Sequence, residues 1–154
     1  MKMFLDKEYI RCISDLISIE DIKKLELYSQ HMKTNRLYHS ISVSYYTYKL
    51  CKKLGLDYRA GARSGLLHDF FLYDHKTEKV MGSHLKSHPK VALKNSKKYT
   101  KLTKVEKDAI KKHMWPITSS RPKFKESYIL TIVDKYCAFK EVYERSAERI
   151  FKKS

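Results

Sequence analysis

The chain has few of the residues that break helices or cross-link small domains. Its 154 residues include only four Gly, three Pro and three Cys. No segment therefore has the composition of a flexible linker, and no internal repeat is visible, so we expect a single domain over residues 1–154. Cys12, Cys51 and Cys137 are odd in number and far apart, which argues against a disulfide framework and against a thiolate zinc site.

Long hydrophobic runs are also lacking. At the start of the chain only Met3, Phe4 and Leu5 form an apolar stretch before Asp6 and Lys7 restore charge. Such a stretch is too short for the apolar part of a signal peptide or for a membrane-spanning helix. We therefore expect a cytoplasmic protein with no membrane partner.

Acidic residues are in short supply. The chain has 33 Lys and Arg against 17 Asp and Glu, which gives a formal net charge of +16. This excess favours anionic partners such as nucleotides, phosphorylated metabolites or nucleic acid. Most of the basic residues are Lys that we expect on solvated helix faces, so we interpret the charge mainly as compositional bias. A small anionic substrate is thus the favoured partner and nucleic acid a less favoured one.

The apolar residues recur at helical spacing, and no segment has the pattern of a strand. The sequence therefore predicts an all-α protein. Gly55 suits a left-handed helix stop, Asp57 a helix cap, and Thr103 with Glu106 a capping box, whereas residues 70–87 have no clean period and predict an irregular loop. The expected helices cover residues 18–32, a segment from Asn35 to about Leu54, 57–69, a segment starting at His88-Pro89, 103–113, and a long last helix from about Lys125.

Small residues and a His-Asp doublet share one of these helices. Gly61, Ser64 and Gly65 lie on the same predicted face as His68, where they would allow a neighbouring helix to approach closely. His68-Asp69 ends this run. A close approach would help ligands from different helices to converge on the doublet.

Other His and Asp residues lie where their helices should present an apolar face. Asp134 interrupts the apolar stripe of the last helix, and an ionised carboxylate is costly there unless a cation compensates it. Imidazole and carboxylate are ligands that divalent Mn, Fe, Ni, Co and Zn accept. We therefore predict a buried site for one or two such ions, with ligands drawn from His39, His68, Asp69, His88, His113 and Asp134.

The order of these residues resembles the HD-domain superfamily of metal-dependent phosphohydrolases. The family pattern is a His, a His-Asp doublet and a distant Asp. The resemblance implies an HD-type helical bundle with the metal site in its core and a motif-bearing region of about 35–140. It also implies that His39, His68, Asp69 and Asp134 hold a first metal, that His88 and His113 hold a second, and that Asp69 bridges the two.

This chain departs from the family in one respect that bears on phosphate binding. Several subfamilies carry a Gly-Lys shortly after the doublet, whereas here Phe70 and Phe71 follow it. We therefore expect Arg36, one helical turn before His39, to contact the phosphate. His84, four residues before His88, is expected to act as a proton donor or an alternative ligand. Lys135 should point away from Asp134, since a helix turns about a hundred degrees per residue.

The function that the resemblance implies is hydrolysis of a phosphate ester of a nucleotide or small phosphometabolite through a metal-activated hydroxide. Two alternatives remain open. Some proteins that look similar are di-iron oxygenases with nearly the same ligands. A basic domain that binds RNA or a nucleotide and holds a structural metal is the other alternative. The sequence predicts neither the exact substrate nor the oligomeric state.

Overall fold

The fold is entirely helical, as predicted. The computed structural model describes residues 5–30, 34–74 and 83–151. Within these ranges no strand occurs, apart from an isolated bridge between Ser29 and Asn35. The helices are α1 (Lys7–Ile17), α2 (Glu20–Lys23), the 3-10 helix η2 (Lys24–Leu27), α3 (Arg36–Lys53), α4 (Tyr58–Leu67), α5 (His84–Tyr99), α6 (Lys104–Lys112) and α7 (Lys125–Phe151).

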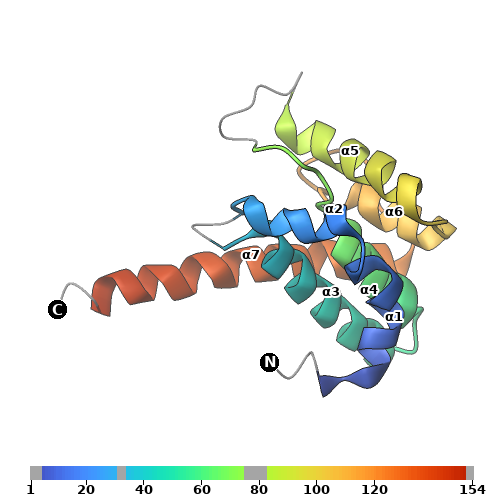
Figure 1. The fold of residues 1–154 in the computed structure, drawn as a ribbon, viewed down its shortest axis with the longest axis horizontal. Helices are drawn as coiled ribbons and strands as arrows, with labels where there is room; N and C mark the ends of the chain where they lie inside the picture. The colour runs from blue at the N-terminus through green and yellow to red at the C-terminus, as the bar shows by residue number, and fades with distance from the viewer. Residues whose placement is uncertain (1–4, 31–33, 75–82, 152–154) are drawn as a thin grey trace.

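Helices α3 and α4 form the centre of the molecule (Figure 1). Helix α7 packs against α3, α4 and α6, and α1 packs against α4. Helices α5 and α6 lie together at one end of the molecule, and the C-terminal half of α7 extends beyond the rest of the chain (Figure 1). None of the described helices is both long and apolar enough to span a bilayer.

The helix signals in the sequence act largely as expected. The Asp57 side chain accepts a hydrogen bond from the backbone N–H of Ala60 at the start of α4. Thr103 and Glu106 form a reciprocal capping box at the start of α6. Gly55 ends the α3 segment with a φ of 67°, a conformation that only glycine adopts without strain. These caps satisfy backbone groups that a helix end leaves unpaired.

Two expected helix boundaries were wrong. The helix expected over residues 18–32 ends at Lys23, continues as a 3-10 turn to Leu27 and gives way to extended backbone at Tyr28, while residues 31–33 lie outside the described ones. His88 is not at a helix cap, because α5 begins at His84 with Ser83 as its cap. Pro89 is therefore inside the helix, where it removes one backbone hydrogen bond close to the exposed first turn.

The predicted close approach of small residues occurs between α3 and α4. A Cβ atom added to Gly65 would lie 2.5 Å from Cα of Ser44, on the backbone of the facing helix. The Ser44 hydroxyl donates to the carbonyl of Ala62 across the same contact at 2.6 Å. Close packing of these two helices brings His39 near the doublet at the end of α4.

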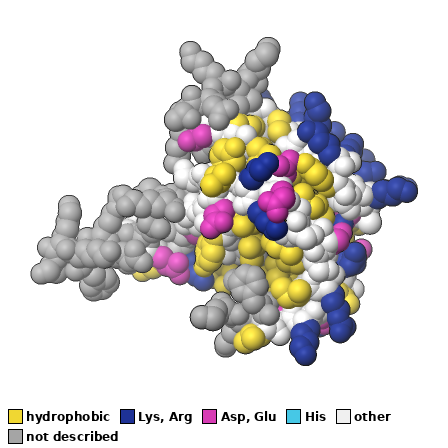
Figure 2. All heavy atoms as spheres, in the orientation of Figure 1, with side chains coloured by type: hydrophobic (Ala, Val, Ile, Leu, Met, Phe, Trp, Pro, Cys, Tyr) yellow, Lys and Arg dark blue, Asp and Glu magenta, His cyan; other side chains and the backbone are white. Residues whose placement is uncertain are grey.

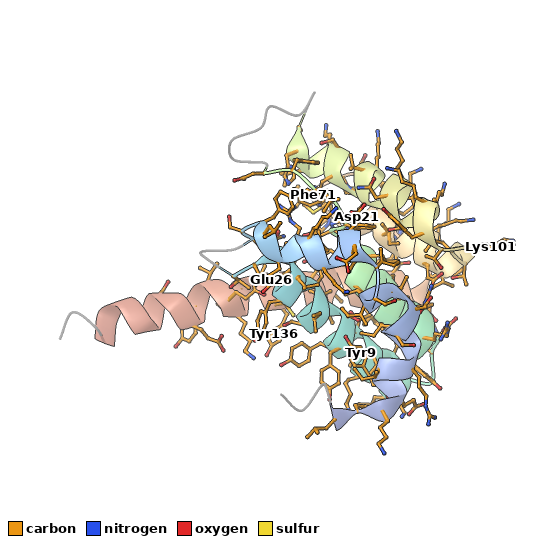
Figure 3. The ribbon with its side chains drawn as sticks, in the orientation of Figure 1. Tyr9, Asp21, Glu26, Phe71, Lys101 and Tyr136 are labelled. Atoms are coloured by element: carbon orange, nitrogen blue, oxygen red, sulfur yellow. The ribbon has the colours of Figure 1, made fainter. Side chains whose placement is uncertain are left out.

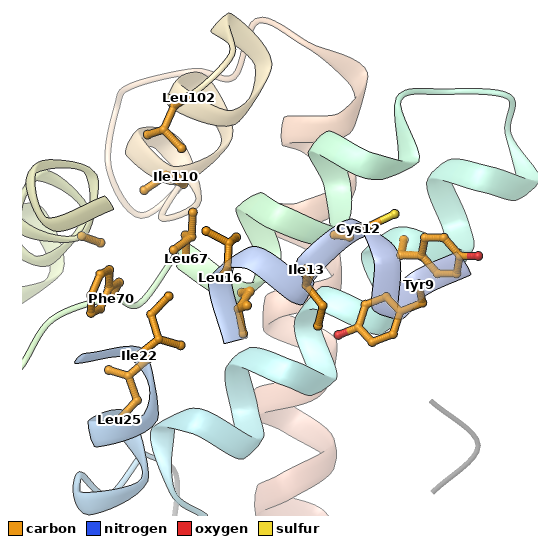
Figure 4. Packing of buried hydrophobic residues seen from close by; sticks show 14 residues of the cluster. Tyr9, Cys12, Ile13, Leu16, Ile22, Leu25, Leu67, Phe70, Leu102 and Ile110 are labelled. Atoms are coloured by element: carbon orange, nitrogen blue, oxygen red, sulfur yellow. The ribbon is translucent and has the colours of Figure 1, made fainter. Parts of the chain in front are cut away.

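A hydrophobic core holds α1, η2, α4 and α6 together. Figure 4 shows Leu16 and Ile22 from the N-terminal segment pointing toward Leu67 and Phe70, which flank the doublet in the sequence. All four side chains are almost fully buried. Burial of this apolar area fixes the backbone on both sides of His68 and Asp69.

Candidate metal centre

The structure brings together all six residues that the sequence singled out as ligands. They come from five separate segments: His39 from α3, His68 and Asp69 from the end of α4, His88 from α5, His113 from the end of α6, and Asp134 from α7. All are buried except Asp134, whose side chain is 13% exposed and lines a cavity. The site is therefore assembled from residues up to 95 positions apart in the chain.

The Nδ1 atom of each of these histidines faces a hydrogen-bond acceptor. Three acceptors are backbone carbonyls one helical turn earlier: Gly65 for His68 at 2.7 Å, His84 for His88 at 2.8 Å, and Ile110 for His113 at 2.8 Å. His39 Nδ1 lies 2.9 Å from Glu141 Oε1. Because a carbonyl oxygen only accepts, Nδ1 must carry the proton, and Nε2 is left as the atom that can ligate.

The Nε2 atoms point toward the two aspartates. His39 Nε2 and His68 Nε2 lie 3.0 and 3.4 Å from Asp134 Oδ1. His88 Nε2 and His113 Nε2 lie 3.3 and 3.6 Å from Asp69 Oδ1. The arrangement is thus two pairs of imidazoles, each pair facing one carboxylate. The doublet supplies one member to each group and so links them, with His68 Nε2 lying 3.6 Å from Asp69 Oδ2.

Several of these atoms lack the partner that burial would require. Among the described residues, His68 Nε2 and Asp69 Oδ1 are buried with no hydrogen-bond partner. His88 Nε2 and His113 Nε2 are only 2.9 Å apart although neither has a proton to donate when Nδ1 carries it. A cation between such atoms would satisfy them, since unpaired buried polar atoms are otherwise costly.

Two overlapping groups have the spacing of a metal site. Ligand atoms of His39, His68 and Asp134 all lie within 4.8 Å of one another, and so do those of His68, Asp69 and His113. Imidazole nitrogen with carboxylate oxygen is a donor set suited to divalent transition metals. The residues present therefore fit one or two divalent ions.

The electrostatics of the site follow from mixing histidines with carboxylates away from water. Burial disfavours the charged form of His39, but hydrogen bonds to Asp134 and Glu141 outweigh burial and raise its pKa to about 10. Burial and the neighbouring His68 lower the pKa of His113 to about 3. Burial opposes ionisation of Asp69 and Asp134, yet the surrounding histidines hold both pKa values well below the usual range. Both carboxylates are thus charged at neutral pH.

Glu141 is a site residue that the sequence reasoning missed. It is 8% exposed, and its Oε2 atom is buried without a hydrogen-bond partner. It follows Asp134 by seven residues, which is two turns of α7, so both carboxylates face the same side of the helix. That spacing is a signal that could have identified Glu141 from the sequence.

Arg36 does not have the surroundings expected of a phosphate ligand. Its side chain is fully buried, Nη1 donates to the carbonyls of Phe71 and Tyr73 at 2.6 and 3.2 Å, and the guanidinium lies 3.6 Å above the Phe71 ring. Phe71 is labelled in Figure 3, close to the start of α5. Arg36 is not among the residues lining the cavity. The carbonyl groups of the segment after the doublet therefore hold the guanidinium away from the cavity.

Gln30 connects Arg36 to the doublet. Arg36 Nε donates to Gln30 Oε1 at 3.0 Å, and Gln30 Nε2 donates to Asp69 Oδ2 at 2.6 Å. Arg36 therefore acts on the site through Gln30. Gln30 belongs to a segment that the sequence predicted as helix, and no motif marked it.

A cavity of about 300 Å³ opens onto the site. Its apolar lining consists of Leu85, Met114, Ile117 and Ala138. The polar lining comprises Gln30, Asp69, His84, His88, His113, Asp134 and Lys135. This volume suits a small ligand with one polar end.

His84 and Lys135 both line this cavity. The His84 ring stacks on His88 with centroids 4.6 Å apart, and its Nδ1 lies 3.4 Å from the Tyr73 hydroxyl. The prediction that Lys135 points away was wrong. Lys135 leaves α7 in a different direction from Asp134, but its side chain is long enough to curve back to the cavity. Its Nζ atom donates to the carbonyl of His113 at 2.9 Å.

Comparison with protein families agrees with the residue pattern. The family model described as HD domain matches residues 36–138, about two thirds of the chain. The match begins at the start of α3 and ends within α7, so it includes all six convergent residues. Comparisons with curated proteins and with solved structures gave no significant match.

Proposed function

The chain belongs to the HD domain family, and on that premise we propose that it is a metal-dependent phosphohydrolase. The substrate class we propose is a phosphate ester of a nucleotide or a small phosphometabolite. Phosphate esters carry negative charge, and the net charge of +16 favours their approach.

One observation carries the proposal. Four histidines donate Nδ1–H to fixed acceptors, so that four Nε2 atoms face the carboxylates of Asp69 and Asp134 beside a cavity. His39, His68, Asp69 and Asp134 would hold one ion, and Asp69, His88 and His113 a second. A divalent cation held there would supply Lewis acidity toward water and phosphate oxygens.

The remaining steps fall to residues of the cavity. Lys135 presents an ammonium group that can bind and orient a non-bridging phosphate oxygen. The apolar side chains of Leu85, Met114 and Ile117 can contact the rest of the substrate. His84 can deliver a proton to the departing oxygen, since imidazole exchanges protons near neutral pH.

The test is turnover of p-nitrophenyl phosphate and bis-p-nitrophenyl phosphate after supplementation with Mn, Fe, Co, Ni or Zn. Asp69→Asn is expected to abolish turnover, whereas Glu144→Gln, an exposed carboxylate on α7, should leave it unchanged. Active protein would then be tested on a panel of nucleotides. Metal binding without turnover of any phosphate ester, or oxygen consumption by iron-loaded protein, would overturn the proposal.

A further inference from the structure

The hairpin formed by α5 and α6 has an unusual balance of charge. Residues 83–112 contain ten lysines and only two acidic residues, Glu106 and Asp108. Both acidic residues are buried, and each has a basic partner. Glu106 accepts a hydrogen bond from Arg63 Nε at 2.8 Å, and Asp108 forms an ion pair with Lys112 at 2.6 Å. Lysine is therefore the only charged residue type that this hairpin exposes to solvent.

The exposed lysines form two rows. Their spacing of three or four residues places each row along one side of its helix, opposite the residues that face the core. The rows consist of Lys86, Lys90, Lys94 and Lys97 on α5, and Lys104, Lys107 and Lys111 on α6. We refer to these seven residues as the lysine face.

No lysine of this face takes part in an ion pair with another described residue, whereas lysines elsewhere do. Lys23 and Lys24 pair with Glu20 and Asp21 of the same helical segment. Like charges three or four residues apart destabilise a helix. A bound anion would relieve this repulsion along both rows.

The two helices that carry these rows run side by side, away from the candidate metal centre. The hairpin is antiparallel, because His88 near the start of α5 contacts His113 at the end of α6. From Lys86 to Lys97 the α5 row spans about 16 Å at the helical rise per residue. Figure 2 shows Lys and Arg side chains along the edge where Figure 1 places α5 and α6, and Lys101 lies at the far end of that edge in Figure 3.

We propose that the lysine face binds the sugar–phosphate backbone of a single nucleic-acid strand. Rows of flexible ammonium groups match a ligand whose phosphates repeat along a line, and contacts of this kind are independent of base sequence. A lipid surface fits less well, because the exposed large apolar residues of the hairpin are only Leu85 and Tyr99, near the two ends of α5. The proposal goes beyond the phosphohydrolase activity and does not require a metal.

The experiment measures fluorescence anisotropy of a labelled single-stranded RNA of mixed sequence, in EDTA and over a range of salt concentrations. The test variant is Lys90→Gln/Lys94→Gln/Lys97→Gln, and the matched control is Lys7→Gln/Lys49→Gln/Lys53→Gln, three exposed lysines on α1 and α3. Glutamine keeps the helix propensity and removes the charge. Circular dichroism establishes that both variants are folded.

We expect the native chain to bind with an affinity that falls steeply with salt. The test variant should bind at least about tenfold more weakly, and its slope of log affinity against log salt should decrease by about 2, since each phosphate contact on a single strand contributes about 0.7. The control should bind like the native chain.

Three results would overturn the proposal. Equal losses of RNA affinity in the two triple variants would mean that RNA binding depends only on the total charge of the chain. Absence of RNA binding at low salt would exclude the lysine face as a nucleic-acid-binding surface. Lysine-dependent cosedimentation with phosphatidylserine vesicles, without RNA binding, would assign the face to membranes. Because EDTA removes metal from every sample, failure of the phosphohydrolase proposal would not change any of these outcomes.

Discussion

Glu141 Oε1 lies 2.9 Å from Nδ1 of His39, on the side of the ring opposite to Asp134. Both carboxylates come from α7, two helical turns apart, so one helix holds this imidazole from both edges. A carboxylate behind a ligating histidine fixes its tautomer and raises its basicity. We therefore infer a positioning role for Glu141, which can be tested apart from the proposed ligands themselves.

Glu141→Gln should weaken divalent metal binding by about 10–100-fold, because the amide no longer supplies negative charge behind His39. Competition with a fluorescent chelator measures the affinity for Mn and Co. The control is Glu144→Gln, since Glu144 is largely exposed on the same helix and its ion-pair partner among the described residues is Lys140, at 3.8 Å. Equal affinities in the two variants would argue that Glu141 has no effect on the site.

Metal affinity should rise with pH between about 6.5 and 10. The hydrogen bonds that His39 donates to Asp134 and Glu141 outweigh burial and raise its pKa to about 10, so a metal must displace a proton from this ring at neutral pH. Each displaced proton makes affinity increase by up to about tenfold per pH unit. Calorimetry in buffers of different ionisation enthalpy counts the released protons, and release of none at pH 7.5 would contradict the protonated His39.

The same raised pKa contributes to the pH dependence of folding in EDTA. The interaction of protonated His39 with its carboxylates stabilises the fold fully below about pH 6.5, where the unfolded chain also holds the proton. This contribution is lost as pH rises toward 10. Chemical denaturation across that range measures it, and His39→Gln should flatten the dependence.

Lys135→Met should weaken inhibition by inorganic phosphate by about tenfold or more, since a hydrogen bond to a charged group contributes about 1.5–3 kcal/mol. Burial lowers the pKa of Lys135, partly offset by Asp134. Methionine keeps a side chain of similar length in the cavity lining and removes the charge. The matched control, Lys140→Met, removes a half-exposed lysine of the same helix. Similar inhibition constants for both variants would remove Lys135 from substrate binding.

Arg36→Met should lower the free energy of unfolding by about 3 kcal/mol, because the buried carbonyls of Phe71 and Tyr73 lose their donor. Arg59, an exposed arginine at the start of α4, provides the control through Arg59→Met. Urea denaturation gives the stability of each. A variant as stable as the native chain but with a raised KM would instead place Arg36 against the substrate.

Gly65→Ala should destabilise the fold by about 1–3 kcal/mol or more, since the new methyl group meets the backbone of Ser44. Gly61→Ala is the control on the same helix. Its nearest contacts are side-chain atoms, Cys51 Sγ at 3.0 Å and Thr47 Cγ2 at 3.3 Å, which can shift. The melting temperatures of the two variants are compared. An equal decrease in both would contradict a backbone contact that is specific to Gly65.

The sequence predicted the parts of this molecule that depend on local chemistry. Three such features are the helical periodicity, the caps at Asp57 and Thr103, and the small residues before His68. Each depends on residues within a few positions, so each can be predicted from the sequence directly. The convergence of His39, His68 and Asp134 could be anticipated because each interrupts an apolar face at a cost that only a shared partner would offset.

The parts that the sequence did not predict depend on contacts between distant segments. Whether Arg36 faces a cavity or backbone carbonyls is decided by the path of residues 71–73, 35 or more positions later. Lys135 reaches the cavity through side-chain length, which a helical wheel does not include. Gln30 lies in a stretch that has a helical sequence pattern but becomes extended backbone at Tyr28. No nearby residue therefore indicated that the Gln30 amide would contact the site.

The distance along the chain between the paired ligands has a consequence for biosynthesis. His39 meets Asp134 and Glu141 across 95 and 102 positions, and both carboxylates belong to the last helix. During translation, His39, His68 and Asp69 leave the ribosome long before α7 can dock on them. A nascent chain therefore cannot offer the complete set of donors until α7 has been synthesised and has docked on α3 and α4, so an ion bound by all six residues would report that this helix is in place.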